Sequence, residues 1–300
     1  MSILEVAVYY VPHHEKYKMG RLALKGRNIY FEYDASFLDT GIELSPFLLP
    51  LKPGVITCED RLFDGLYGVF NDSLPDGWGR LLLDCKLRSL GMHANDLTPL
   101  DRLCYVGYHG MGALVYEPEM ASSRAIVHQH LDAIADETVQ FLEHDEDRHI
   151  DDLLLLNGSS AGARPKILVS IQNNTFVASD VSSQPSENHW LIKFRSSLDP
   201  KDNGPIEYAY HLMAKAAGLD VPDARLFESK KGPGYFGVKR FDRMKGQRIH
   251  MHTLCGLLHL DHRIPSLDYE TLIKVTWRLC HDIREMEKTI SRSCFQSLCP

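Results

Sequence analysis

The chain has 300 residues, 44% of them hydrophobic and 24% charged, which is typical of a soluble globular protein large enough for two domains. Its net charge of -7 argues against nonspecific nucleic-acid binding by the whole surface. It has no apolar run of about 18 residues and no basic, apolar leader, so we expect neither a membrane span nor a secretory signal. We therefore expect a cytoplasmic protein. The seven cysteines include no Cys-x-x-Cys pair, so we expect reduced thiols, and the histidines show no ligand spacing for a metal.

The first half of the chain predicts a small sheet followed by helices. Apolar and polar residues alternate over the first 35 residues, which predicts antiparallel strands with turns at Pro12 to His14 and Lys25 to Asn28. From Phe63 to Leu90 the spacing becomes helical. Residues 95 to 105 predict a short capped helix, followed by a glycine-rich loop from 107 to 112 and a strand from 113 to 116.

The second half predicts a further set of strands after an acidic helical stretch from 117 to 152. A basic run from Lys230 to Arg248 favours a solvated face, with an anion site as the alternative. The expected strands cover residues 166–171, 175–178, 189–194, 224–228 and 235–240, and the expected helices cover 205–218 and 269–286.

The loop from Asn157 to Lys166 consists mostly of small residues and leads into an apolar strand. Small residues allow backbone N–H groups to surround phosphate oxygens. The loop matches neither the P-loop nor the Gly-x-Gly-x-x-Gly pattern, so a tight turn before a strand remains the alternative.

Two further segments have the residues of a nucleotide site. Lys193 lies near the end of an apolar strand, and Glu207 follows in a predicted helix; kinases pair such a lysine with a helix glutamate. The strand from Gly237 to Arg243 ends in charged residues around an aromatic one, as a hinge beneath a base would. The alternatives are a solvent-facing lysine and an edge strand.

Together these features resemble the HipA family of toxin kinases, and the resemblance covers almost the entire chain. It also rests on three other segments: Phe31 to Asp34, Leu44 to Pro46, and Asn71 to Arg80, which reads Asn-Asp-Ser-Leu-Pro-Asp-Gly-Trp-Gly-Arg. The resemblance implies an α+β, protein-kinase-like fold that uses ATP and Mg²⁺ to phosphorylate a protein serine. It further implies a HipB-like helix-turn-helix antitoxin as partner, contact with DNA only through that antitoxin, no membrane association, and an aminoacyl-tRNA synthetase, glutamyl-tRNA synthetase in the best-known members, as substrate.

The resemblance assigns roles to particular residues. Lys193 would contact phosphate and Glu207 would orient it, while Arg240 and Phe241 would lie at the adenine hinge. Lys239 departs from the family, which commonly has Glu at that position. A serine of the loop, Ser159 or Ser160, would be the autophosphorylation site. The loop residues expected around the phosphates are Ser160, Ala161, Gly162, Ala163, Arg164 and Lys166.

The resemblance also divides the chain into four parts. Residues 1–118 would form the N-terminal domain, 119–152 an acidic helical connection, 153–288 the ATP-binding part of the kinase core, and 289–300 a divergent, non-helical tail. Family members continue into an Asp-x-His-x-Lys-Asn loop and a metal-binding Asp, neither of which this sequence contains. We therefore expect a frameshift or truncation near Thr289, with an incomplete C-terminal helical lobe. No catalytic base and no metal ligand are then assigned, and the product would be inactive; the alternatives are an antitoxin-binding remnant or decoy and a poorly folding fragment.

Overall fold

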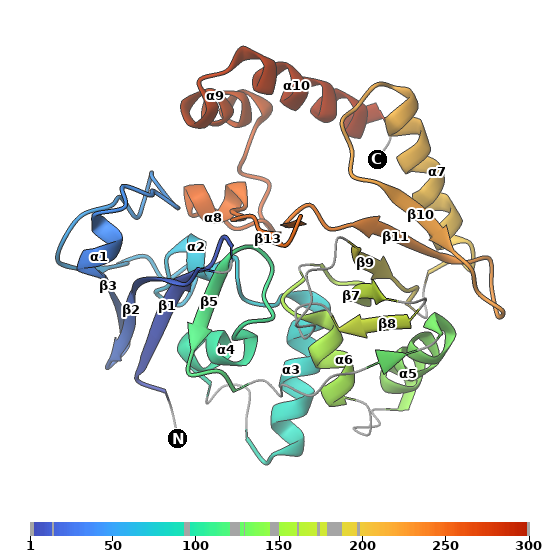
Figure 1. Ribbon diagram of the computed structural model, residues 1–300, viewed down its shortest axis with the longest axis horizontal. Coiled ribbons are helices and arrows are strands. Elements are labelled where there is room, and N and C mark those ends of the chain that lie inside the picture. Colours follow the sequence, from blue (N-terminus) through green and yellow to red (C-terminus); the bar gives the residue numbers. More distant parts are fainter. Residues whose placement is uncertain are drawn as a thin grey trace.

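The structure is a computed structural model with a mixed α+β architecture, as the sequence predicted, built around two antiparallel sheets (Figure 1). It describes residues 3–13, 15–92, 97–120, 127–128, 130–144, 150–160, 162–172, 175–178, 188–196 and 199–298. None of the helices in this described part combines the length and the apolar character that a bilayer crossing requires.

The first sheet has the order β4-β3-β2-β1-β5 and is antiparallel throughout. Its strands are β1 (Glu5–Tyr10), β2 (Tyr17–Lys25), β3 (Asn28–Tyr33), β4 (Val55–Thr57) and β5 (Leu114–Glu117). The alternation seen in the sequence places Val6, Val8, Leu22 and Phe31 in one core. The chain turns between β2 and β3 at Gly26, whose φ of 65° favours glycine. The predicted N-terminal sheet is therefore confirmed.

Helices cover this sheet and lead to the second one. They are α1 (Ala35–Leu38), α2 (Gly68–Asn71), α3 (Gly77–Ser89) and α4 (Pro99–Val106). The helical stretch predicted from Phe63 is interrupted between α2 and α3, because Pro75 disfavours helical geometry at the residue before it. Helix α4 begins with the expected cap, in which Thr98 and Asp101 exchange hydrogen bonds.

The second sheet has the order β10-β11-β9-β7-β8-β6. Strand β7 is central and mostly buried, and α5 and α6 lie beside the sheet, with Ile134, Leu156, Val169 and Ile192 in the shared core (Figure 1). The elements are β6 (Val127–His128), α5 (Leu131–His144), α6 (Ile150–Asn157), β7 (Lys166–Gln172), β8 (Thr175–Ala178), β9 (His189–Lys193), α7 (Asn203–Ala216), β10 (Ala224–Phe227) and β11 (Tyr235–Lys239).

The last part of the chain consists of a small hairpin and three helices: β12 (Arg243–Met244), β13 (Gln247–Arg248), α8 (Leu254–Leu258), α9 (Tyr269–Cys280) and α10 (Ile283–Leu298). The helix expected over 269–286 is divided at His281, which has a left-handed φ of 49°. The expectation of a non-helical tail from 289 was wrong, because α10 continues to Leu298. Ile283, Met286 and Ile290 recur at helical spacing, and this pattern continues past Glu287. Residues 299–300 lie outside the described part.

Candidate functional site

The loop between α6 and β7 requires small residues at two of its positions. A Cβ atom on Gly158 would lie 2.7 Å from the carbonyl oxygen of His109, and one on Gly162 would lie 2.6 Å from Nζ of Lys166. Both glycines also have positive φ, at 56° and 112°. Ala161, one of the expected phosphate-contacting residues, lies outside the described residues.

The N-terminal domain holds this loop in place through the Leu-Pro-Asp-Gly segment. The backbone N–H of Gly162 donates a hydrogen bond to the Asp76 carboxylate, and the N–H of Trp78 donates to the Gly162 carbonyl at 3.1 Å. Gly77 approaches so closely that a Cβ on it would lie 2.6 Å from Cα of Ala163. Two segments that the sequence offered as separate motifs therefore form one structural unit.

Both candidate serines are buried and hydrogen-bonded. The Ser159 hydroxyl accepts a hydrogen bond from the N–H of Met111 at 2.9 Å, and the Ser160 hydroxyl donates to Oδ1 of Asn157 at 3.0 Å. Neither hydroxyl is presented to solvent in this arrangement. Phosphorylation of either serine would require the loop to leave its present position.

Strand pairing brings two lysines together beside the loop. Lys166 opens β7 and lies directly opposite Lys193 at the end of β9, in the register of the antiparallel pair. The sequence predicted both strands but not their pairing. Burial is the main reason that the pKa of Lys166 is lowered to about 8; the Asp76 carboxylate opposes this effect, and the positive charge of Lys193 adds to it.

Lys193 is held by a carboxylate from α7, as expected for a kinase-like lysine. Its Nζ lies 2.6 Å from Oε2 of Glu207, whose other oxygen accepts a hydrogen bond from Asn203 at 3.2 Å. Lys193 and Glu207 are both only partly buried and line a small open cavity of about 140 Å³ together with Phe236. The pair is thus fixed in direction and still reachable.

Arg164 is directed elsewhere. Its Nε and a terminal guanidinium nitrogen each lie 3.0 Å from Oδ1 of Asp199. The N–H of Ser196 and the Arg164 guanidinium help to lower the pKa of Asp199. Arg164 is therefore already paired, although its side chain stays half exposed.

The two expected hinge residues line the same cavity but differ in exposure. Phe241 is 50% exposed and borders an open cavity of about 810 Å³ with Lys239, Met244 and Arg292. Arg240 is buried, and its guanidinium binds the Asp242 carboxylate with nitrogen–oxygen distances of 2.7 and 2.9 Å. Arg240 is thus held by a neighbouring carboxylate, while the Phe241 ring remains accessible from the cavity.

Asp242 is the centre of a buried cluster that the sequence did not reveal. Its carboxylate is fully buried and also binds Arg243 at 2.8 Å and the N–H of Gly112 at 2.9 Å. Burial alone raises the pKa of Asp242, but the arginines and this N–H outweigh burial and hold the pKa at about 2. Arg243 and Arg248 in turn donate to the carbonyls of Gly110 and Gly112.

The arginines of the basic run therefore fasten the glycine-rich loop of the N-terminal domain to the β12-β13 hairpin. Arg240, Arg243 and Arg248 are each at most 6% exposed. Neither a solvated face nor an anion site describes these three residues. Their guanidinium groups bind partners inside the protein, namely one carboxylate and several backbone carbonyl groups.

A second link between the two halves has the composition of a catalytic triad. His252 Nδ1 lies 2.6 Å from Asp72, and its Nε2 lies 3.0 Å from the Ser45 hydroxyl. Ser45 is only 2% exposed, however, and Asp72 also caps α8 through Thr253 at 2.6 Å. A nucleophile must be reachable by its substrate, so we interpret this arrangement as structural. Within the described residues, no group of three or more His, Cys, Asp or Glu side chains is placed to hold a metal ion.

Comparison with known proteins gives two family matches and a match of fold. Residues 13–117 match the family model described as the HipA N-terminal domain, and residues 158–300 match the HipA-like C-terminal domain. No curated protein sequence matches the chain. Among solved structures, a chain of the complex of the Shewanella oneidensis MR-1 toxin–antitoxin system HipA, HipB and its operator DNA is similar, with a TM-score of 0.65 at 17% identity. The match covers 97% of this chain and 68% of that chain.

Proposed function

Because the chain belongs to the HipA family, we propose that it forms the ATP-phosphate-binding part of a HipA-like serine/threonine protein kinase. One observation carries this proposal. The pairing of β7 with β9 places the Lys193–Glu207 ion pair directly beside Lys166 and the loop that begins at Ser159. A lysine oriented by a helix carboxylate is the group with which kinases bind ATP phosphates.

The charges in this corner suit a polyanion. Two lysines lie opposite each other on neighbouring strands, and the pKa of Lys166 is low mainly because the side chain is buried, with a smaller contribution from Lys193. A bound phosphate beside Lys166 would favour the protonated form of this lysine. Phe236, near the start of β11, lines the cavity of Lys193, and Phe241, which follows the other end of this strand, borders the second cavity.

The Mg²⁺ that accompanies ATP does not find a ligand set among the described residues, which form no suitable cluster of carboxylates. The sequence also lacks the Asp-x-His-x-Lys-Asn segment that supplies the base and a metal ligand in the family. We therefore propose that these 300 residues bind the nucleotide but do not transfer its phosphoryl group. Removing the base and the metal contacts takes away most of the stabilisation of the transition state.

The partner follows from the same family. We propose a HipB-like helix-turn-helix antitoxin, since the similar solved structure is a complex with HipB and operator DNA. The net charge of -7 supports contact with DNA through that antitoxin rather than by this chain. The substrate of a complete kinase of this kind would be a protein serine, with an aminoacyl-tRNA synthetase as the candidate.

Calorimetric titration with ATP tests the nucleotide site. Replacing Lys193 by Ala should weaken ATP binding by about tenfold or more, because one charge-assisted hydrogen bond to phosphate is lost. Lys274→Ala is the matched control, since Lys274 forms an exposed pair with Glu270 on α9. Equal affinity of the Lys193→Ala variant and the wild type would contradict the proposal. A separate assay with radiolabelled Mg-ATP should show no transfer, and turnover by this chain alone would refute the proposed inactivity.

A non-catalytic antitoxin-binding protein is the second candidate. The N-terminal sheet has a hydrophobic core of its own, separate from the core of the second sheet, so it can present a binding surface without any chemistry. Co-purification with the helix-turn-helix protein, together with an absence of ATP binding, would favour this function over the first.

A further inference from the structure

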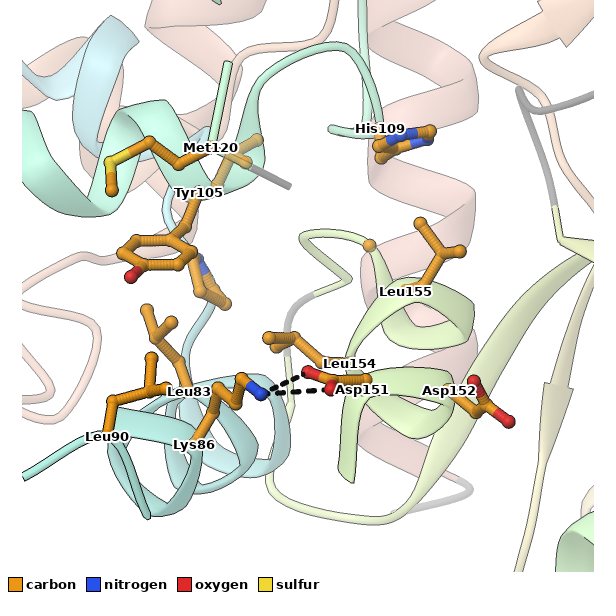
Figure 2. A pocket seen from close by; sticks show the side chains of 13 residues that line it. Leu83, Lys86, Leu90, Tyr105, His109, Met120, Asp151, Asp152, Leu154 and Leu155 are labelled. Carbon is orange, nitrogen blue, oxygen red and sulfur yellow. Dashed lines mark hydrogen bonds and ion pairs between the residues drawn. The ribbon is translucent and has the colours of Figure 1, made fainter. Parts of the chain in front are cut away.

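A cavity of about 340 Å³ lies on the boundary of the two halves, away from the two lysines of the proposed nucleotide site. Helices α3 and α4 form one side of it and α6 forms the other (Figure 2). Its volume falls in the range of small-molecule sites, roughly 300–1,000 Å³. Lys166, Lys193 and Glu207 of the proposed nucleotide site do not line this space.

The walls of the cavity are mostly apolar. Leu83 from α3 and Leu154 and Leu155 from α6 face the space, and Tyr105 and Met120 close it on the side of α4 (Figure 2). A thioether and an aromatic ring are favourable neighbours for a flat aromatic ligand. These walls favour an uncharged ring system of one or two rings.

The charged residues at the cavity do not call for a charged ligand. Lys86 is paired with Asp151, with nitrogen–oxygen distances of 2.8 and 2.9 Å. Asp152 also borders the cavity, but Figure 2 shows its carboxylate on the far side of α6 from Lys86. A neutral ligand therefore leaves the existing ion pair intact and avoids burying a new charge.

One polar atom in the wall lacks a partner. His109 is 8% exposed, and its Nδ1 is buried without a hydrogen bond within the described residues. Its Nε2 lies 3.4 Å from Glu119, and with the ring hydrogen on that nitrogen, Nδ1 is an acceptor. Buried polar atoms in proteins are nearly always satisfied, so a donor is needed here.

We propose that this cavity binds a small neutral aromatic molecule with one N–H or O–H donor, which hydrogen-bonds to Nδ1 of His109. The ligand would lie beside Gly158, the residue that precedes Ser159, and would fill the space between α4 and α6. The inference does not depend on ATP binding, because neither Lys193, Glu207 nor the loop residues from Ser159 onward line the cavity.

A matched pair of probes tests the proposal on the unmodified chain. Indole and 1-methylindole have the same ring system, but only indole has the N–H donor. We expect calorimetry to show one indole site and about fivefold weaker binding of 1-methylindole, the effect of one neutral hydrogen bond. Saturable shifts of the Met120 methyl resonance on indole addition, without shifts at Met286 on α10, would locate the site.

Two variants complete the test. His109→Phe keeps a ring but removes the acceptor, so it should lower indole affinity to that of 1-methylindole and leave the latter unchanged. Leu154→Trp fills the cavity and should block both probes. No saturable binding of indole to the wild type at millimolar concentration would overturn the proposal. So would equal affinities for the two probes, because Nδ1 would then be satisfied by water. Both decisive outcomes come from the wild type and do not depend on the folding of a variant.

Discussion

Replacing Asp242 by Asn would show how strongly the two halves of the molecule are joined. The carboxylate is fully buried and binds Arg240, Arg243 and the backbone N–H of Gly112. Asparagine keeps the size of the side chain but removes its negative charge. Two buried guanidinium groups would then lose the carboxylate that they share, in a place where water cannot replace it.

The expected loss can be worked out in two ways. The pKa of Asp242 is lowered from 3.8 to about 2, and that difference corresponds to about 2 kcal/mol of stability. Breaking a buried ion pair by removing one partner typically costs about 3–5 kcal/mol, because the remaining charge is left uncompensated. The value from the pKa shift describes only protonation of the carboxylate, whereas the substitution removes the ion pair. We therefore use the larger range for the substitution. We expect Asp242→Asn to lower the free energy of unfolding by about 3–5 kcal/mol at pH 7.

Urea denaturation followed by circular dichroism measures this loss. Asp223→Asn is the control, because Asp223 is exposed and lies close to the same strand. The folded pKa of Asp242 lies below the unfolded value, so its stabilisation is fully present above pH 3.8 and is lost as the pH falls through about 2. The difference between wild type and Asp242→Asn should therefore narrow between pH 4 and pH 2. A loss below about 1 kcal/mol at pH 7 would show that the cluster does not depend on the charge.

Three further changes test the loop between α6 and β7. Gly77→Ala should lower the free energy of unfolding, measured by thermal unfolding, by about 1–3 kcal/mol, because the new Cβ would lie 2.6 Å from Ala163 and φ is 39°. The control Gly91→Ala places its Cβ within 4 Å of no other atom and should cost less. The stability of Lys166→Met should be compared with that of the wild type as a function of pH. The folded pKa of about 8 lies below the unfolded value of 10.5, so the free energy of unfolding of the wild type should rise by up to about 3 kcal/mol relative to this variant as the pH rises through that interval. A difference that does not change with pH would contradict this expectation. Ser159→Asp places a charge in a buried position and should raise hydrogen exchange of residues 157–166 while the first sheet stays protected.

The sequence predicted those parts of the fold that depend on local pattern. Alternation identified the first sheet, and the Thr98–Asp101 spacing identified the start of α4. The tail was misjudged because serine, arginine and cysteine in residues 291–294 interrupt the apolar pattern, although they do not prevent a helix once Ile290 and its neighbours define a face. Local sequence patterns therefore identified the helices and strands but located their ends only approximately.

The candidate site was predicted in its residues but not in its contacts. Lys193 lies in a predicted strand and Glu207 in the predicted helix after it. The two residues are only fourteen positions apart, which is close enough to suggest a pair. The hydrogen bond from Gly162 to Asp76 joins residues 86 positions apart, and no periodicity predicts such a contact. In the sequence, Arg243 and Arg248 resemble surface residues. Only the tertiary structure shows that they donate hydrogen bonds to backbone carbonyl groups of residues 108–112.

Two hydrogen bonds to neighbouring backbone N–H groups connect Asp242 to the loop between α6 and β7. Asp242 follows β11 and holds the N–H of Gly112, the adjacent residue Met111 donates to Ser159, and Ser159 begins the loop that ends at Lys166. Loss of the Asp242 charge should therefore loosen Met111 and release the Ser159 hydroxyl, even though neither residue touches Asp242. Continuity alone does not establish coupling. If hydrogen exchange in Asp242→Asn rises at Gly112 but stays unchanged at Met111 and Ser159, then Asp242 and the loop are independent. The burial of Ser159 would then be explained by the loop's own contacts with the N-terminal domain.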